Sequence, residues 1–263
     1  MAPRPSSRTA AASAPTVGVR RWHAPAPPGP PTAKGHPVQP LLSRAIDGYL
    51  DDLAAAEISD PVLTDMERRA SELGFPIVGR AAGRFLEWIA GLAGASRVVE
   101  LGSGYGYSAY FFARAVGEAG EAGEVVCTDG DPDNAELAEA YLRRAELWDR
   151  IDFRVGDALT AFAAVEDPVD IVYCDIDKDG YPDAWAAAAQ RLPVGGLFIC
   201  DNVLWYGRVA GVAPEEQDPQ VAAAQDAVTP AIRAMTREIT DDPRYATTLV
   251  PIRDGLLVAR RIA

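Results

Sequence analysis

From residue 40 onwards, the hydrophobic positions of the chain follow two patterns that alternate. Apolar residues recur at helical spacing in three N-terminal segments, 40–57, 61–74 and 79–94. Five short apolar runs then alternate with helical segments: runs at 97–102, 124–129, 151–157, 169–175 and 195–202, and helices near 106–117, 132–147 and 182–191. A helix near 219–240 precedes two runs, 245–252 and 254–262, which predict a closing hairpin. This order predicts an α/β domain with a mainly parallel sheet and preceding helices.

The first 39 residues lack any such pattern and are predicted to be a disordered, proline-rich tail. The first 40 residues contain 10 of the 21 prolines and no acidic residue, because Asp47 is the first acid of the chain. Such a composition cannot bury enough apolar surface to offset the entropy lost on ordering. The prolines disfavour a transit peptide, and no apolar segment follows Arg20-Arg21 as an export signal requires. Residues 40–263 are therefore predicted to be the folded domain.

Charge and composition narrow the possible functions. The first 40 residues carry +5, so with −13 for the whole chain the remainder carries −18, which disfavours nucleic-acid binding. No run reaches the roughly 18 apolar residues of a membrane span. The three cysteines, Cys127, Cys174 and Cys200, each end an apolar run, as expected of reduced cysteines in a cytoplasmic protein. Both histidines lie in the tail, so histidine is excluded as an acid–base group of the domain.

Polar residues end nearly every predicted strand. They are Glu100, Asp129, Asp157, Asp175 and the pair Asp201-Asn202. One such acid could simply cap the following helix. In a doubly wound sheet, however, the carboxyl ends of the strands open onto one crevice, where ligands bind. Five acids at these ends therefore predict a binding site.

The stretch "ELGSGYGYS" (100–108) follows the first strand and opens a helix. Gly102, Gly104 and Gly106 let the backbone turn tightly and approach a ligand at the helix N-terminus. The dinucleotide fingerprint requires glycine at position 107, where this chain has Tyr107, and a nicotinamide dehydrogenase is accordingly disfavoured. The spacing instead resembles motif I of the S-adenosylmethionine-dependent methyltransferases. Asp129 suits the ribose hydroxyls of that cofactor, and "GDA", containing Asp157 and Ala158, resembles the segment that contacts adenine.

The stretch "YCDIDKDGY" (173–181) has two readings. Asp175, Asp177 and Asp179 fit the first half of a calcium loop, but its twelfth position is Ala186 instead of glutamate, and a strand precedes it. Alternatively, Asp175 ends one strand, and Asp201 and Asn202 end the next. Neighbouring strands lie about 4.8 Å apart, so the three oxygen donors can converge on one ion. This hard oxygen set suits Mg²⁺, with Lys178 beside it.

At this point the chain resembles the cation-dependent O-methyltransferases, which include catechol and caffeoyl-coenzyme A O-methyltransferases. "ELGSGYGYS", "DIDKDGY" and "GGLFICDNVLWYGRV" carry the resemblance, which runs from about Pro40 to the C-terminus. It implies a Rossmann-like, doubly wound, mostly parallel seven-stranded sheet with N-terminal helices, and a homodimer. It also implies these roles: Asp175, Asp201 and Asn202 as metal ligands; Lys178 as the catalytic base or hydroxyl-orienting group; and Val78, Glu100, Gly102, Ser103, Gly104, Ser108, Asp129, Asp157, Ala158 and Asp177 as cofactor contacts.

The acceptor side is predicted less sharply. Trp205 and Tyr206 follow the metal pair and could form the wall for an aromatic acceptor, or could be ordinary loop packing. Tyr206 stands where the plant enzymes usually have asparagine, which disfavours an acyl-coenzyme A acceptor. Lys178 is expected to have a pKa lowered by burial and by the cation, so that it can accept a proton.

The sequence thus predicts Mg²⁺-dependent transfer of a methyl group from S-adenosylmethionine to a small catechol-like acceptor, with Asp175 also touching the acceptor. One alternative is a methyltransferase of a different acceptor. Another is a non-catalytic metal- or cofactor-binding protein, which would have no need of a base such as Lys178.

Overall fold

The computed structural model describes residues 44–118, 123–212 and 219–263. The predicted tail, residues 1–39, lies outside these ranges, as do residues 40–43 of the first predicted helix. Within the described ranges, no helix combines the length and apolar character needed to cross a membrane.

Three helices form the N-terminal layer: α1 (Arg44–Glu57), α2 (Pro61–Leu73) and α3 (Gly79–Ala93). They occupy the three segments predicted from helical spacing. The Asp60 carboxylate caps α2 by accepting the Val62 amide at 2.7 Å. Its other oxygen accepts the Tyr110 hydroxyl at 2.6 Å from α4 (Tyr107–Glu118). One carboxylate thus starts α2 and ties it to the helix that follows the glycine loop.

Seven strands form a single sheet in the order β3-β2-β1-β4-β5-β7-β6. Strands β1 to β5 are parallel, whereas β7 pairs antiparallel with both β5 and β6. This arrangement confirms the predicted doubly wound, mostly parallel fold and the closing hairpin. The strands are β1 (Arg97–Leu101), β2 (Glu124–Asp129), β3 (Ile151–Val155), β4 (Ile171–Cys174), β5 (Leu197–Cys200), β6 (Tyr245–Val250) and β7 (Leu256–Arg261).

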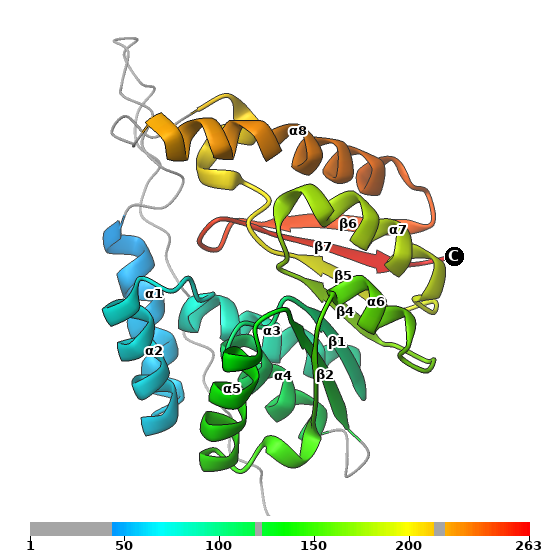
Figure 1. The fold of residues 1–263 in the computed structure, drawn as a ribbon. Helices are drawn as coiled ribbons and strands as arrows, with labels where there is room; N and C mark the ends of the chain where they lie inside the picture. Colours follow the sequence, from blue (N-terminus) through cyan, green and yellow to red (C-terminus); the bar gives the residue numbers. More distant parts are fainter. Residues whose placement is uncertain (1–43, 119–122, 213–218) are drawn as a thin grey trace, which may run out of the picture. The chain divides into compact units, whose positions relative to one another are not determined.

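Alternate residues of the buried strands face two different helical layers (Figure 1). On β1, Val98 packs in the core formed with α2, α3, α4 and α5 (Pro132–Arg144). Its neighbour Val99 packs in the core formed with α6 (Ala158–Ala163), α7 (Tyr181–Arg191) and α8 (Pro219–Asp241). Both faces are covered, so the central strands carry continuous apolar runs, such as Val98-Val99 of β1 and the whole of β5, instead of alternating with polar residues.

A few elements differ from the prediction. The helix expected over 132–147 ends at Arg144, and the six-residue α6 was not predicted. Three short 3₁₀ segments were also missed: η1 (Trp148–Arg150), η2 (Lys178–Gly180) and η3 (Trp205–Ala210). Such short turns have too few residues to show a period.

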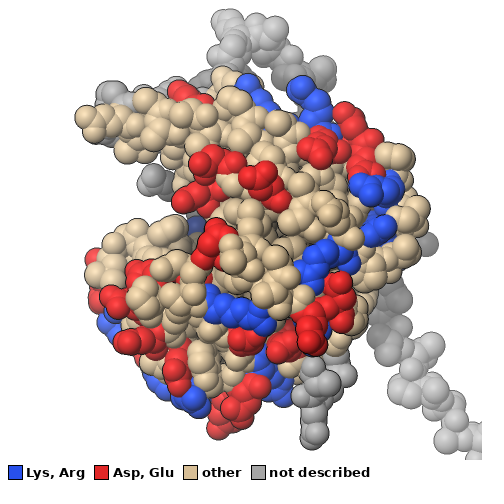
Figure 2. Space-filling view, turned by 45° about the vertical axis from the view of Figure 1, so that its right-hand side comes forward, with Lys and Arg blue, Asp and Glu red and all other residues tan. Residues whose placement is uncertain are grey.

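The carboxyl ends of the parallel strands meet at one edge of the sheet. In Figure 1, β7 points to the right, so its antiparallel neighbour β5 and the other parallel strands point left. Figure 2 shows an indentation at the left of the view with acidic side chains, in red, beside it. The site residues predicted at strand ends therefore lie along one edge.

Candidate active site

The glycine loop after β1 lies in direct contact with the end of β4. Gly102 has φ +83°, and a Cβ there would lie 2.5 Å from the carbonyl oxygen of Asp175. Only glycine permits both the left-handed conformation and this approach. The Ser103 amide donates to the Thr128 carbonyl at 2.8 Å, which fixes the loop against β2 as well.

Glu100 places a carboxylate beneath this loop, fully buried at the end of β1. Burial raises its pKa to about 7, against the opposing effect of the Ser108 and Ser103 hydroxyls. The Cys127 thiol donates to Oε2 at 3.6 Å, while Oε1 has no hydrogen-bond partner among the described residues. A buried acceptor without a partner is costly. An ammonium or hydroxyl donor of a bound cofactor would satisfy it, so Glu100 fits its predicted role.

Asp129 ends β2 with its carboxylate already oriented. Oδ2 accepts the Gly104 amide at 2.9 Å, and Oδ1 accepts the Asp131 amide at 2.9 Å and the Asn134 side chain at 3.1 Å. Each carboxylate oxygen accepts about two hydrogen bonds, so Oδ2 retains room for a hydroxyl. The structure therefore places Asp129 beside the loop with a fixed orientation.

The remaining predicted cofactor residues differ in burial and in the hydrogen bonds that their side chains make. The Asp157 side chain caps α6, because Oδ1 accepts the Thr160 amide at 2.8 Å and its hydroxyl at 2.6 Å. These bonds lower its pKa and direct Oδ1 to the helix. Val78 is buried immediately before α3, and Ser108 is buried in the first turn of α4. Asp177 is exposed and makes no capping bond to η2.

The two predicted metal-ligating carboxylates leave adjacent strands side by side. Cys174 and Cys200 are register partners at the ends of β4 and β5, and Asp175 and Asp201 follow them. Asp201 is buried; it accepts the Tyr173 hydroxyl at 3.1 Å and the Asn202 amide at 2.6 Å. Burial and the charge of Asp175 raise the pKa of Asp201 to about 7. Two carboxylates that repel each other in a buried place form a site that a cation would stabilise.

Asn202 completes the predicted oxygen set. Its backbone has φ +54°, a conformation that asparagine tolerates better than most residues. Among the described residues, no three His, Cys, Asp or Glu side chains cluster as a metal site. The predicted set needs only two such groups, since its third donor is an amide, and its oxygen-only chemistry fits Mg²⁺.

Lys178 lies against Asp175. Its Nζ donates to Asp175 Oδ1 at 2.9 Å and to the Ile176 carbonyl at 3.2 Å, and it lies 5.0 Å from the Tyr181 ring centre and 5.7 Å from that of Trp205. Burial lowers the pKa of Lys178, but the charge and hydrogen bond of Asp175 outweigh it, so the net shift is upward. In this structure the Asp175 contact therefore outweighs the lowering by burial, and the lowering expected from a bound cation stays a prediction.

The two predicted acceptor-side aromatics differ in orientation. Trp205 donates its Nε1 to the Gln225 carbonyl at 2.8 Å and presents its ring to Lys178. Tyr206 is 55% exposed. Both have positive φ, 48° and 53°, a strained conformation for bulky residues. Trp205 thus faces the predicted site, whereas Tyr206 faces solvent.

Asp254, in the turn between β6 and β7, is a site residue that the sequence analysis missed. Its Oδ1 accepts the Tyr206 amide at 2.7 Å, and its Oδ2 is buried with no partner among the described residues. Burial raises its pKa to about 6, while the Tyr206 bond and the charge of Lys178 act against the rise. In sequence, "DG" before an apolar run is an ordinary turn signal, which hid this role.

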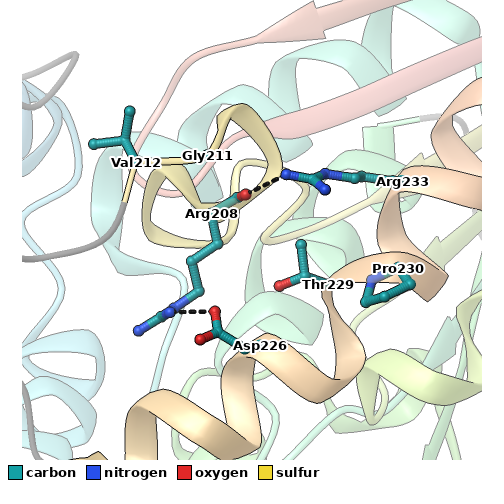
Figure 3. Close-up of a pocket in the computed structure, with 7 residues that line it drawn as sticks. All are labelled: Arg208, Gly211, Val212, Asp226, Thr229, Pro230 and Arg233. Carbon is teal, nitrogen blue, oxygen red and sulfur yellow. Dashed lines mark hydrogen bonds and ion pairs between the residues drawn. The ribbon is translucent and has the colours of Figure 1, made fainter.

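We call the segment that begins with Trp205 and Tyr206, η3, the aromatic loop. A cavity of about 260 Å³ adjoins this loop and is lined by Arg208, Gly211, Val212, Asp226, Thr229, Pro230 and Arg233 (Figure 3). It contains none of the predicted site residues. Buried Arg208 donates to Asp226 Oδ1 at 2.5 Å and to Gln225 Oε1 at 2.9 Å, and Arg233 donates to the Arg208 carbonyl at 2.8 Å. These bonds brace the aromatic loop against α8.

Comparisons with known proteins agree with this geometry. The model of the O-methyltransferase family matches residues 55–262. Caffeoyl-CoA O-methyltransferase 1 of Eucalyptus globulus is 31% identical over 186 residues, 69% of this chain and 73% of the relative. A putative O-methyltransferase of Mycobacterium marinum is 30% identical over 238 residues, 89% of this chain and 99% of the relative.

Solved structures show the same fold. A methyltransferase of Geobacter sulfurreducens is 30% identical with a TM-score of 0.67, covering 85% of this chain and 98% of that one. The O-methyltransferase of Bacillus cereus, solved in complex with SAH (S-adenosylhomocysteine), is 25% identical with a TM-score of 0.69, covering 82% and 97%. The resemblance seen in the sequence motifs is thereby confirmed. The chain belongs to the cation-dependent O-methyltransferase family and is an S-adenosylmethionine-dependent O-methyltransferase.

Proposed function

We propose that this enzyme methylates a hydroxyl of a small, catechol-like vicinal diol, with Mg²⁺ or another divalent cation held by Asp175, Asp201 and Asn202. The observation that carries the proposal is the pairing of Asp175 and Asp201 at the ends of adjacent strands, with Lys178 on Asp175. Relatives named for caffeoyl-CoA support a phenolic acceptor. Tyr206 disfavours the coenzyme A ester itself.

One group of residues binds the methyl donor, and a second group binds the methyl acceptor. Glu100, the backbone of Gly102 to Gly104 and Asp129 hold the cofactor under the glycine loop. Trp205 and Asp254 border the acceptor side, and Lys178 holds or accepts the proton of the reacting hydroxyl. A bound divalent cation supplies a lowered hydroxyl pKa and a fixed diol orientation. Placing the two reactants together in this way removes much of the entropic barrier.

A direct assay tests the proposal. The enzyme is incubated with methyl-labelled S-adenosylmethionine and a panel of catechols and monophenols, with Mg²⁺ or with EDTA. We expect labelled product from catechols only when the metal is present. Transfer to monophenols in EDTA would support a different acceptor class, and tight cofactor binding without any transfer would support a binding protein.

Asp129 is expected to carry recognition of the cofactor ribose. Asp129→Ala removes an acceptor of hydroxyl hydrogen bonds, each worth on the order of 1.5–3 kcal/mol gross for a charged group. Binding of S-adenosylhomocysteine, measured by calorimetry, should weaken roughly tenfold or more while Mg²⁺ affinity stays unchanged. Because Asp129 also holds the Gly104 amide, Asp131→Ala is the control for disturbance of the neighbouring cap. Unaltered cofactor affinity in Asp129→Ala would contradict the assignment.

Metal affinity is expected to fall at acidic pH. Asp201 must lose its proton to bind a cation, and its pKa is raised to about 7. Below about pH 7 the Asp201 carboxyl is therefore expected to hold a proton that a cation must displace. Mg²⁺ affinity, measured calorimetrically in the presence of cofactor product, should drop by up to about tenfold per pH unit below 7 and level off above it. Equal affinities at acidic and alkaline pH would contradict this coupling.

A homodimer is the oligomeric state that the surface favours. Two neighbouring helices carry apolar residues at i, i+3 and i+7, which we call the apolar stripes: Ile46, Tyr49 and Leu53 on α1, and Phe85, Trp88 and Leu92 on α3. All are exposed except Phe85, which is half-buried against the core. Trp88 is 59% and Leu92 72% exposed. Exposed apolar residues gathered on neighbouring helices commonly mark an interface, and a second copy would bury them.

Light scattering after size exclusion tests this state. The wild type should have twice the chain mass of 28.0 kDa, and Trp88→Asp should shift it towards monomer. Val194→Asp, at a 67% exposed apolar position outside the stripes, should stay dimeric. A monomeric wild type at micromolar concentration would refute the proposed homodimer.

The three cysteines are free and buried, which favours a cytoplasmic location for the protein.

A further inference from the structure

The turn between β6 and β7 places a cation beside the candidate active site. Arg253 is the second residue of a tight turn in which the Gly255 amide donates to the Ile252 carbonyl at 2.9 Å. The Arg253 backbone has φ +51°, and its side chain is exposed. The next residue, Asp254, accepts the Tyr206 amide and therefore fixes this turn to the aromatic loop.

The side chain of Arg253 runs towards the start of α3. A Cβ on Gly79 would collide with Arg253 Nη1 and would lie 3.2 Å from Cζ and 3.4 Å from Cδ. Gly79 has φ +75° and directly follows Val78. The guanidinium therefore lies between the acceptor-side hairpin and the N-terminal layer, at the rim of the site.

This guanidinium is available to a ligand. Within the described residues, Arg253 makes no hydrogen bond or ion pair. The other cation of the site, Lys178, is already engaged by Asp175 at 2.9 Å. A guanidinium presents a planar fork of donors that matches a carboxylate, and a single such contact also lends specificity.

We propose that Arg253 binds a carboxylate carried by the acceptor, so that the preferred acceptors are catechols with an acidic substituent opposite the diol. The inference rests on the proposed function, in which the diol lies at Asp175 and Asp201. A substituent on the far side of a flat ring then points away from those carboxylates and towards the rim. The cofactor also has a carboxylate, but Arg253 belongs to the turn that hydrogen-bonds the acceptor-side loop.

The test compares two acceptors that differ in charge alone as far as possible: 3,4-dihydroxybenzoate and its methyl ester. With full-length enzyme, saturating cofactor and Mg²⁺, we expect wild type to favour the acid by roughly two- to fivefold in kcat/KM, the range of an exposed ion pair. Arg253→Gln should remove this preference, and Arg253→Lys should retain part of it. Arg260→Gln, at an exposed arginine of β7 away from the turn, should keep the wild-type ratio.

Any other result contradicts the assignment of Arg253 as the carboxylate-binding residue, and the results can be told apart. An acid-to-ester ratio that is the same in Arg253→Gln as in wild type removes Arg253 from acceptor recognition. An unchanged ratio together with weakened S-adenosylhomocysteine binding assigns Arg253 to the cofactor carboxylate instead. If wild type methylates both acceptors equally, only the subsite fails. If it methylates neither, the proposed function fails and the subsite fails with it.

Discussion

Asp175→Ala is expected to abolish methyl transfer at any Mg²⁺ concentration while leaving cofactor affinity largely intact. The substitution removes one of two carboxylates that converge at the ends of β4 and β5, and it also frees Lys178 from its partner. Without a cation to lower the hydroxyl pKa, a phenol is a poor nucleophile at neutral pH. Activity is measured with labelled cofactor over a Mg²⁺ titration, and cofactor binding by calorimetry.

The controls separate loss of metal from loss of fold. Wild type treated with EDTA should lose activity and regain it on addition of Mg²⁺, whereas Asp175→Ala should not recover. Asp201→Ala should behave like Asp175→Ala. Asp179→Ala should keep both metal and activity, since Asp179 is exposed and belongs only to the rejected calcium loop. Loss of metal in Asp179→Ala with retention in Asp201→Ala would move the site away from the strand ends.

Lys178→Met is expected to lower kcat by roughly 10²–10⁴, the usual size of a general-base contribution, with metal and cofactor still bound. Lys178 Nζ lies 2.9 Å from Asp175 Oδ1 and faces the Trp205 ring. Lys178→Arg should not restore activity, because a guanidinium does not release its proton near neutral pH. Initial-rate assays with saturating substrates give kcat, and calorimetry measures the affinities for the metal and the cofactor.

The pH profile then decides between the two roles of Lys178. The Asp175 carboxylate raises the pKa of Lys178, so an amine paired with Asp175 is protonated at neutral pH. If it acts as a base once Asp175 is engaged by a metal, kcat should rise with pH in wild type, and this limb should be absent in Lys178→Met. If it only orients the hydroxyl, both profiles should have the same shape. A Lys178→Met enzyme with wild-type kcat would exclude both roles.

The parallel sheet was predictable because the hydrophobic pattern of its strands differs clearly from that of the helices between them. Apolar runs such as 97–102 and 124–129 are buried on both faces, while the intervening helices carry one apolar side. The position of β7 between β5 and β6 depends on pairing far along the chain, and local pattern predicts only that β6 and β7 form a hairpin. The helix α6 was missed because its six residues, which follow the capping Asp157, are too few to show a helical period.

Site residues at strand ends were predictable from the sequence. Site residues that reach the site only through contacts between distant segments were not. Asp175 and Asp201 follow buried strands, so their proximity follows from parallel pairing in register. Asp254 comes from a turn about 50 residues later, and only the fold brings it to the Tyr206 amide. The direction of the Lys178 pKa shift likewise depends on a contact, since burial and Asp175 act in opposite directions.

The backbone contact between Gly102 and Asp175 limits where the sequence of this enzyme can change. Insertions at the contact should be harmful, whereas segments outside it can vary. The Asp175 amide donates to the Leu101 carbonyl at 2.8 Å, and its own carbonyl lies against Gly102. In the proposed function, the methyl donor lies at the glycine loop and the acceptor at Asp175, so this one stretch of backbone would set their separation. An insertion there would change that separation. The loop after Asn202 and the β6–β7 turn lie outside this contact. New acceptor specificities should therefore be sought by exchanging those two segments, with the donor half left untouched.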